Sequence, residues 1–271
     1  MDEGYFNPLH LILVLLGSLF AHASVNVFND YFDYMRGTDI IAKRTPFSGG
    51  SGFLPSGLVT PKEAFLMATT FLVLGILIGI YFMILYPILI PIILLGAFLV
   101  YAYTPLLTRV YITELFPGLG FGLMVIGTYV TMLPPGSTIK DPAAIAAAVV
   151  PGILISNLLF LNEFPDYEAD YKTGRRHMVI ILGRKRASKV YVMLIALAYI
   201  WLVISILIKL VPITAAIGLA TFPIAFKACK ECLRYYDKIE KLLPALAKNV
   251  LVTLLTPTLI AIGFLADYII F

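Results

Sequence analysis

Eight long apolar segments constrain the fold of this chain more than any other feature. A transmembrane α-helix needs about 20 mostly apolar residues, and each segment reaches or approaches that length. Helices satisfy their own backbone hydrogen bonds inside a bilayer, and the segments lack the alternation of a membrane β-barrel. With 60% hydrophobic and 13% charged residues, the chain predicts one polytopic, all-α transmembrane domain over residues 1–271. The segments are residues 8–33, 61–84, 86–103, 112–133, 142–164, 188–208, 211–227 and 246–270.

The distribution of Lys and Arg supports this number of spans. If the loop after the first span faces the cytosol, only Lys140 and Lys209 of the 20 Lys and Arg residues lie on the opposite side. The positive-inside rule predicts such a bias, and a wrong number of spans would mix the two sets. We therefore predict eight spans in the cell membrane, both termini outside, and a polar cap on the cytosolic side. The net charge of +4 gives no support for a nucleic-acid partner, and no obligate protein partner is inferred.

Amides and carboxylates recur every three or four residues where the first and fifth spans end. On a helix such positions share one face, and the second set does so if the helix continues through Pro165. Carboxylates this close repel one another unless a positive group lies between them. The topology above places both sets on one side of the membrane. The first set is Asn26, Asn29, Asp30 and Asp33, and the second is Asn162, Asp166 and Asp170.

Two such sets indicate a divalent metal shared with a phosphorylated ligand. Oxygen ligands suit Mg²⁺, which usually keeps waters and takes substrate phosphates into its coordination shell. A diphosphate held at the membrane surface above an apolar bundle fits an isoprenoid diphosphate, whose allylic cation needs a dry pocket. Basic side chains in the adjoining loops would bind the remaining phosphate charge. The candidates are Lys43, Arg44, Lys172, Arg175 and Arg176.

Several other polar residues near these sets leave alternatives open. A helix break at Gly37 lets Asp39 fold back toward the site or leaves it solvated. The glycines of the following loop either approach an anion or form turns. Tyr101 and Tyr103 belong either to an interfacial aromatic belt or to a substrate pocket, and Glu114 needs a partner or a polar cavity. The possible acceptor-binding or supporting residues are therefore Asn26, Asp39, Tyr101, Tyr103 and Glu114.

The two motifs resemble the paired aspartate motifs of the UbiA superfamily of intramembrane prenyltransferases. Asn29-Asp30-x-x-Asp33 followed by Gly37 and Asp39 resembles the first, and Asp166-x-x-x-Asp170 followed by Gly174 resembles the second. The similarity covers nearly the whole chain and is closest to the branch that prenylates 1,4-dihydroxy-2-naphthoate in menaquinone biosynthesis. That branch also has a loop like Phe47-Ser48-Gly49-Gly50-Ser51-Gly52.

The resemblance implies a helical bundle around a central cavity, a lateral opening to lipid, and two Mg²⁺ ions on the diphosphate. The family usually has nine spans, one of them before the first motif, whereas this chain starts at what would be the second. The region from Tyr101 to Arg109 lacks the Tyr-x-x-x-Lys spacing of some members. The residues implied to bind metal are Asn29, Asp30, Asp33, Asn162, Asp166 and Asp170, and of these Asp33, Asp166 and Asp170 are the catalytic candidates. Those implied to bind the diphosphate are Arg44 and Lys172, to which Lys43 and Arg175 are added.

The resulting prediction is an enzyme that transfers a polyprenyl group from its diphosphate to a lipid-soluble, aromatic acceptor resembling 1,4-dihydroxy-2-naphthoate. A prenylated glycerol phosphate, as in ether-lipid synthesis, is the alternative acceptor. A transporter is the alternative from another class. Transporters place charged sites near the bilayer midplane, whereas the acidic groups here lie at the ends of spans.

Overall fold

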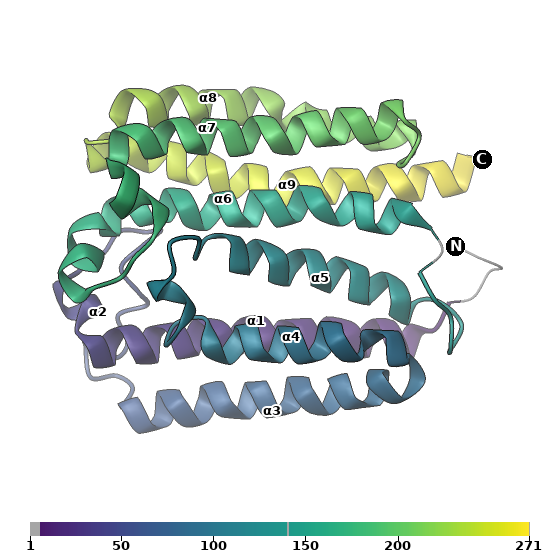
Figure 1. Cartoon of the computed structure of the whole chain (residues 1–271), viewed down its shortest axis with the longest axis horizontal. Coiled ribbons are helices and arrows are strands. Elements are labelled where there is room, and N and C mark those ends of the chain that lie inside the picture. Colours follow the sequence, from purple (N-terminus) through teal and green to yellow (C-terminus); the bar gives the residue numbers. More distant parts are fainter. Residues whose placement is uncertain (1–5, 140, 271) are drawn as a thin grey trace.

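The protein is a bundle of long helices that lie side by side (Figure 1). The structure is a computed structural model that describes residues 6–139 and 141–270. These residues contain no strand; Thr45 and Ser48 form one isolated bridge. The elements are α1 (Pro8–Arg36), α2 (Thr38–Ile41), α3 (Pro61–Leu85), η2 (Pro87–Leu89), α4 (Ile90–Ala102), η3 (Leu107–Arg109), α5 (Leu115–Thr131), α6 (Pro142–Thr173), α7 (Met178–Leu207), η4 (Ile213–Thr221), α8 (Phe222–Tyr235) and α9 (Ile239–Ile270).

The predicted all-α membrane fold is confirmed, and every predicted span is largely helical. Within the described ranges, 6 helices are long and apolar enough to cross a membrane: α1, α3, α6, α7, η4 with α8, and α9. The remaining two spans correspond to the shorter apolar helices Pro87–Ala102 and Leu115–Thr131. The count of eight crossings therefore stays a prediction.

Four of the described helices extend at least seven residues beyond the predicted spans. α6 ends at Thr173 rather than at residue 164, α8 ends at Tyr235 rather than at 227, and α9 begins at Ile239 rather than at 246. The sixth span was expected to begin at residue 188, but α7 begins at Met178, directly after the second acidic motif and its basic loop. The backbone of Gly183 is not helical (φ 73°, ψ 151°), so a kink separates the first turns of α7 from its long apolar part. The kink lets the chain re-enter the polar end of the bundle before it turns along the membrane axis.

Local sequence signals set where the first long helices begin. The Asn7 side chain accepts hydrogen bonds from the backbone N–H groups of Leu9 (3.0 Å) and His10 (3.2 Å), and so caps α1. Thr60 and Glu63 form a capping box at the start of α3, in which each side chain accepts from the other residue's backbone N–H. These bonds satisfy donors that the first helical turn leaves free.

The two helices that carry the acidic motifs end in the same way. α1 stops at Gly37 (φ 81°) and α6 at Gly174 (φ 79°), both in the left-handed conformation that glycine adopts without strain. α6 continues through Pro165, as the spacing of the second motif requires. Both motifs therefore lie in the last turns of their helices, at the end of the bundle where α2 lies (Figure 1).

The helices form two groups, and α5 and α6 pack against each other where the two groups meet. α1 packs on α3, α5 on α6, and α6 on α7 and α9. The largest buried apolar cluster belongs to α6–α9 and includes Phe160, Phe164 and Tyr191. Smaller clusters around Phe28 and Tyr86 join α1, α3 and α4. The apolar cavity described below lies where α1, α3, α4, α5 and α6 meet.

Candidate active site

A polar cavity of about 620 Å³ lies at the end of the bundle where α1 and α6 stop. Its wall comes from the ends of these two helices, from α2, from the loop at residues 42–51 and from the segment that leads into α7. Segments far apart in the sequence thus meet around one space. All six residues predicted to bind metal line the cavity: Asn29, Asp30, Asp33, Asn162, Asp166 and Asp170.

The first and second motifs are joined by a single guanidinium. One Arg175 nitrogen, Nη2, lies 2.5 Å from Oδ2 of Asp33, and the other, Nη1, lies 3.4 Å from Oδ1 of Asp170. Burial opposes the charge of Arg175, but the carboxylates of Asp33 and Asp170 outweigh burial and raise the pKa of the guanidinium. Two carboxylates 137 positions apart therefore face one another closely enough to share one positive group.

Further hydrogen bonds hold the first motif in place. The Asn29 amide donates to Oδ2 of Asp33 (2.9 Å) and to Oγ1 of Thr104 (3.1 Å). One oxygen of Asp30 accepts from the backbone N–H of Ser51 (3.2 Å), which ties the glycine-rich loop to α1. Because these contacts come from three segments, the acid groups are fixed before any ligand binds.

Asp39 folds back onto the site, which decides one of the open alternatives. Its side chain is buried and lines the cavity. The loop closes over it so tightly that a Cβ atom on Gly50 would lie 2.5 Å from an Asp39 oxygen. Glycine at this position is required by that approach and by its φ of 68°. Burial, followed by the nearby charges of Asp33 and Asp30, raises the pKa of Asp39 to about 7.

The polar cavity offers ligands that suit Mg²⁺. Within the described part of the chain, the Oδ1 atoms of Asp33, Asn162 and Asp166 are buried and have no hydrogen-bond partner, and Oδ1 of Asp170 has only the ion pair with Arg175. Buried oxygen atoms rarely stay unpaired in native proteins, so these three atoms imply a missing partner. Carboxylate and amide oxygens are hard ligands of the kind that Mg²⁺ takes.

The predicted basic residues divide into two groups. Arg44 and Arg175 line the cavity, although Arg44 also donates to the backbone oxygen of Ser51. Lys43 and Lys172 are exposed, and the structure does not place them in the cavity wall. Arg176 is also exposed and donates to the hydroxyl of Tyr111 (3.5 Å).

The two tyrosines also separate. Tyr103 lines the cavity, whereas Tyr101 is exposed and packs edge-on against Phe28, with ring centroids 5.4 Å apart. Tyr101 lies in the last turn of α4 and Tyr103 is the residue that caps it, and the two face different directions, so the belt and pocket interpretations each fit one tyrosine. Asn26 lines the cavity as well and donates to the backbone oxygen of His22 (2.9 Å).

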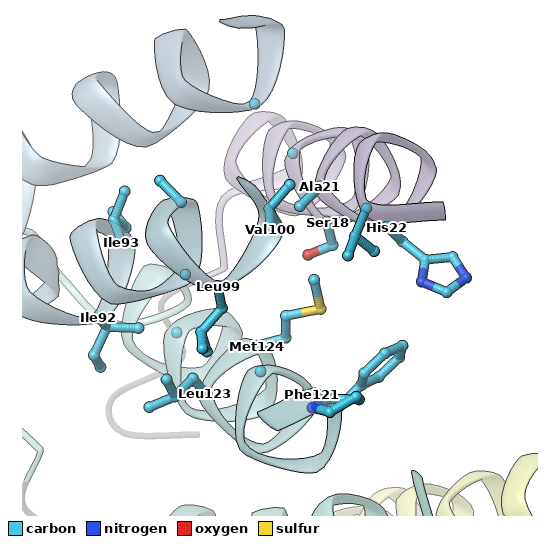
Figure 2. A pocket seen from close by; sticks show the side chains of 18 of the residues that line it. Ser18, Ala21, His22, Ile92, Ile93, Leu99, Val100, Phe121, Leu123 and Met124 are labelled. Carbon is cyan, nitrogen blue, oxygen red and sulfur yellow. The ribbon is translucent and has the colours of Figure 1, made fainter. Parts of the chain in front are cut away.

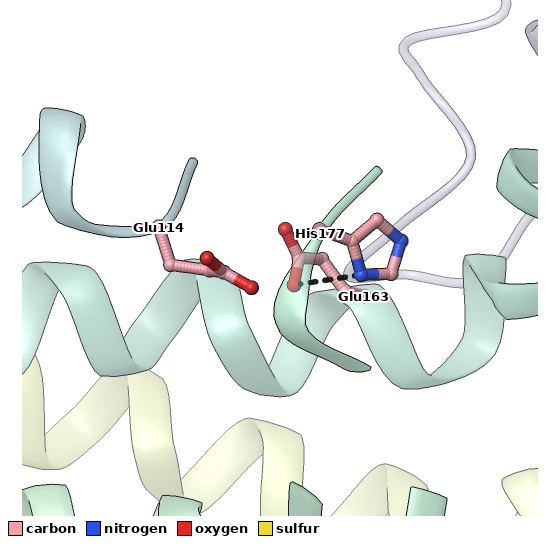
Figure 3. A group of neighbouring side chains, drawn as sticks. All are labelled: Glu114, Glu163 and His177. Atoms are coloured by element: carbon pink, nitrogen blue, oxygen red, sulfur yellow. Dashed lines mark ion pairs between the residues drawn. The ribbon is translucent and has the colours of Figure 1, made fainter. Parts of the chain in front are cut away.

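Sequence reasoning missed two ionisable residues of the cavity wall, Glu163 and His177. Both are buried and lie beside Glu114, which is buried too (Figure 3). Glu163 stands seven positions before Asp170, two helical turns away on the same face of α6, and this spacing was a usable signal. His177 had no such signal, because its position depends on the turn after Gly174.

An apolar cavity of about 400 Å³ lies next to the polar one, inside the bundle. Its wall includes Ala21, Ile92, Val100 and Met124, from α1, α4 and α5 (Figure 2). The two cavities have lining residues in common, so they are adjacent. The shared residues are Asn26, Asn29, Tyr103, Leu159 and Asn162.

This architecture defines a class: an all-α integral membrane protein that can hold an amphiphile, with its polar head among carboxylates and its apolar part inside the bundle. The chain belongs to the UbiA prenyltransferase family, whose sequence model matches residues 2–264. The predicted family is confirmed, and with it the prediction of a prenyltransferase.

The curated relatives that this chain is similar to share one name. The 1,4-dihydroxy-2-naphthoate octaprenyltransferase of Bacillus subtilis (strain 168) is 27% identical over 199 residues, 72% of this chain and 62% of that protein. The enzyme of the same name from Escherichia coli (strain K12) is 26% identical over 281 residues, 98% of this chain and 87% of that protein. The match to the first relative thus spans less than two thirds of its length.

Solved structures share the fold. The apo structure of a UbiA homologue from Aeropyrum pernix K1 has a TM-score of 0.75 at 16% identity, over 97% of this chain and 92% of that chain. A UbiA homologue from Archaeoglobus fulgidus, bound to GPP and Mg²⁺, has a TM-score of 0.57 at 17% identity, over 94% and 89%. A digeranylgeranylglyceryl phosphate synthase structure has a TM-score of 0.65 at 22% identity, over 96% and 87%.

Proposed function

We propose that this protein transfers a polyprenyl group from a polyprenyl diphosphate to a lipid-soluble aromatic acceptor that resembles 1,4-dihydroxy-2-naphthoate. The single observation that carries the proposal is the junction of the two cavities. An acid-lined chamber suited to a metal-bound diphosphate lies next to an apolar chamber suited to an isoprenoid chain, and the two share five lining residues. The names of the curated relatives support the choice of acceptor.

In this proposal Asn29, Asp30 and Asp33 hold one Mg²⁺ ion, and Asn162, Asp166 and Asp170 hold a second. Bound Mg²⁺ supplies positive charge that stabilises the leaving diphosphate. Arg175 then has two roles. Without ligand it separates the carboxylates of Asp33 and Asp170, and with ligand its guanidinium can bind a phosphate oxygen in the same place.

The bond between prenyl carbon 1 and the diphosphate oxygen lies, in this proposal, at the junction lined by Asn29, Tyr103 and Asn162. The apolar walls below the junction exclude water, so that the allylic cation is captured by the acceptor rather than hydrolysed. The distribution of Lys and Arg along the chain supports a cytosolic position for the acid-lined chamber, where soluble prenyl diphosphates and Mg²⁺ are available.

A second acceptor class, a prenylated glycerol phosphate, is favoured by the shared fold with the digeranylgeranylglyceryl phosphate synthase. The two acceptors are distinguished by product analysis. Purified protein with geranylgeranyl diphosphate and Mg²⁺ would be offered both, and mass spectrometry would identify the prenylated product. We expect product from the aromatic acceptor, and product from the glycerol phosphate alone would replace this part of the proposal.

The carboxylates are tested by Asp33→Asn and Asp170→Asn. Each variant removes one charge without changing side-chain size, and we expect prenyl transfer to fall at least about 100-fold while the protein still unfolds cooperatively in detergent. The matched control is Glu168→Gln, an exposed acid on the same helix as Asp170. Unchanged activity in both aspartate variants would refute the enzyme proposal, and Mg²⁺-independent uptake of a solute into liposomes would favour a transporter.

A further inference from the structure

Three buried side chains from three separate segments of the chain lie close together (Figure 3), and one of them, His177, contacts Asp170. Glu114 precedes α5, Glu163 belongs to α6, and His177 precedes α7. They are 2%, 6% and 2% exposed. One ligand atom from each, two carboxylate oxygens and an imidazole nitrogen, lie within 4.8 Å of one another. No two of the three are close in the sequence, so the fold assembles this cluster.

The facing atoms of the cluster have no hydrogen-bond partner. Within the described residues, this holds for Oε2 of Glu114, Oε2 of Glu163 and Nδ1 of His177. Nδ1 of His177 lies 3.2 Å from Oε2 of Glu163 without the geometry of a hydrogen bond. Two ligands of one ion at bond lengths of about 2.1 Å lie about 3.4 Å apart in a tetrahedral arrangement, so this separation suits a shared ion.

The other polar atoms of Glu114 and His177 are already held. Oε1 of Glu114 accepts from the backbone N–H of Met178 (2.7 Å). Nε2 of His177 lies 3.2 Å from Oδ2 of Asp170. An N–H at Nε2 that donates to Asp170 leaves the lone pair of Nδ1 directed at the two glutamates. Histidine ligands of metals commonly donate their second ring N–H to a carboxylate in this way.

We propose that Glu114, Glu163 and His177 bind one divalent transition-metal ion at a site distinct from the Mg²⁺ site of the two acidic motifs. Imidazole is a ligand for Zn²⁺, Co²⁺, Fe²⁺ or Mn²⁺ rather than for Mg²⁺, and the two carboxylates complete a mixed set of three ligands. Glu163 and His177 line the polar cavity, so water can fill the open positions. The ion fixes His177, and through Nε2 the carboxylate of Asp170.

Cobalt binding tests this site without any prenyl substrate, so the result does not depend on the proposed function. Purified protein, stripped with EDTA and kept in excess Mg²⁺, would be titrated with Co²⁺ and followed by visible absorption. We expect one Co²⁺ per chain with the absorption bands of low-coordinate Co²⁺. Glu114→Gln, Glu163→Gln and His177→Gln should each weaken Co²⁺ binding at least about tenfold.

Two control variants separate this site from its surroundings. Asp166→Asn alters the Mg²⁺ motif, and Glu168→Gln alters an exposed acid on the same helix; both should keep the Co²⁺ absorption bands. The proposal is overturned if excess Mg²⁺ displaces all Co²⁺, or if the three variants bind Co²⁺ as the parent does. A proton shared among the three side chains would then explain the cluster. If one of the three variants fails to fold, the other two still locate the Co²⁺ ion.

Discussion

At the scale of single residues, the site contains more buried carboxyl groups than cationic side chains to pair with them. Asp33, Asp39 and Asp170 are all buried, and Arg175 is the guanidinium that lies between two of them. Such an arrangement is costly without added positive charge, because burial and like charges both oppose ionisation. The site is therefore organised for a cation rather than for maximal stability.

The effect of burying acidic groups on stability can be measured at Asp39. Its pKa is raised to about 7 by burial and by the charges of Asp33 and Asp30, so the folded protein keeps a proton that the unfolded chain has lost. The free energy of unfolding should thus fall as pH rises from about 4 to about 7, by a few kcal/mol at most. Thermal unfolding in detergent with EDTA should show the decline, and Asp39→Asn should make it shallower, because the other buried carboxyl groups of the site remain. Equal pH slopes in both proteins would contradict the assignment.

At the scale of elements, α1 and α6 act as a pair. Each delivers its acidic motif in its last turns and stops at a left-handed glycine, Gly37 or Gly174. The C-terminal end of a helix carries partial negative charge, which adds to that of the carboxylates and favours a bound cation. The carbonyl ends of both helices therefore support the same ligand chemistry as their side chains.

α5 forms one wall of the apolar cavity, and its glycines leave room for a chain. Gly127 lines the cavity toward the end far from the acids, and an added Cβ atom there would meet nothing within 4 Å. Gly127→Leu should therefore fold normally but shorten the cavity. We expect kcat/KM for geranylgeranyl diphosphate to fall at least about tenfold, and that for dimethylallyl diphosphate to change little.

The control is Leu119→Phe, which adds bulk to an exposed position on the same helix. Both donors should be used normally by this variant. An equal loss for the two donors in Gly127→Leu would mean that the substitution disturbs the helix rather than the cavity.

At the scale of the whole molecule, both acidic motifs lie at one end of the bundle, and the loop after α5 lies at the other (Figure 1). Single cysteines can report which end faces the cytosol. In a background with Cys229→Ser and Cys232→Ser, we expect Ser56→Cys in intact cells to react with an impermeant maleimide only after permeabilisation. Thr138→Cys should react directly; both positions are exposed. The reverse pattern would invert the predicted topology.

The sequence alone determined the helical membrane bundle and the two acidic motifs. Hydrophobic length and the spacing of side chains along one helix are local properties that survive without knowledge of the fold. This is why the two acidic motifs and the family could be predicted from the residues, whereas the course of α6 through Pro165 was only a condition of that prediction.

Only the tertiary structure decided which neighbours complete the site. It turned Asp39 inward, put Tyr103 rather than Tyr101 at the cavity, left Lys43 and Lys172 exposed, and brought Glu114 and His177 to Glu163. These outcomes depend on where loops close and on which face of a helix meets another. Contacts between residues distant in the sequence determine how the loops close and which helix faces meet, and no local sequence pattern encodes these contacts.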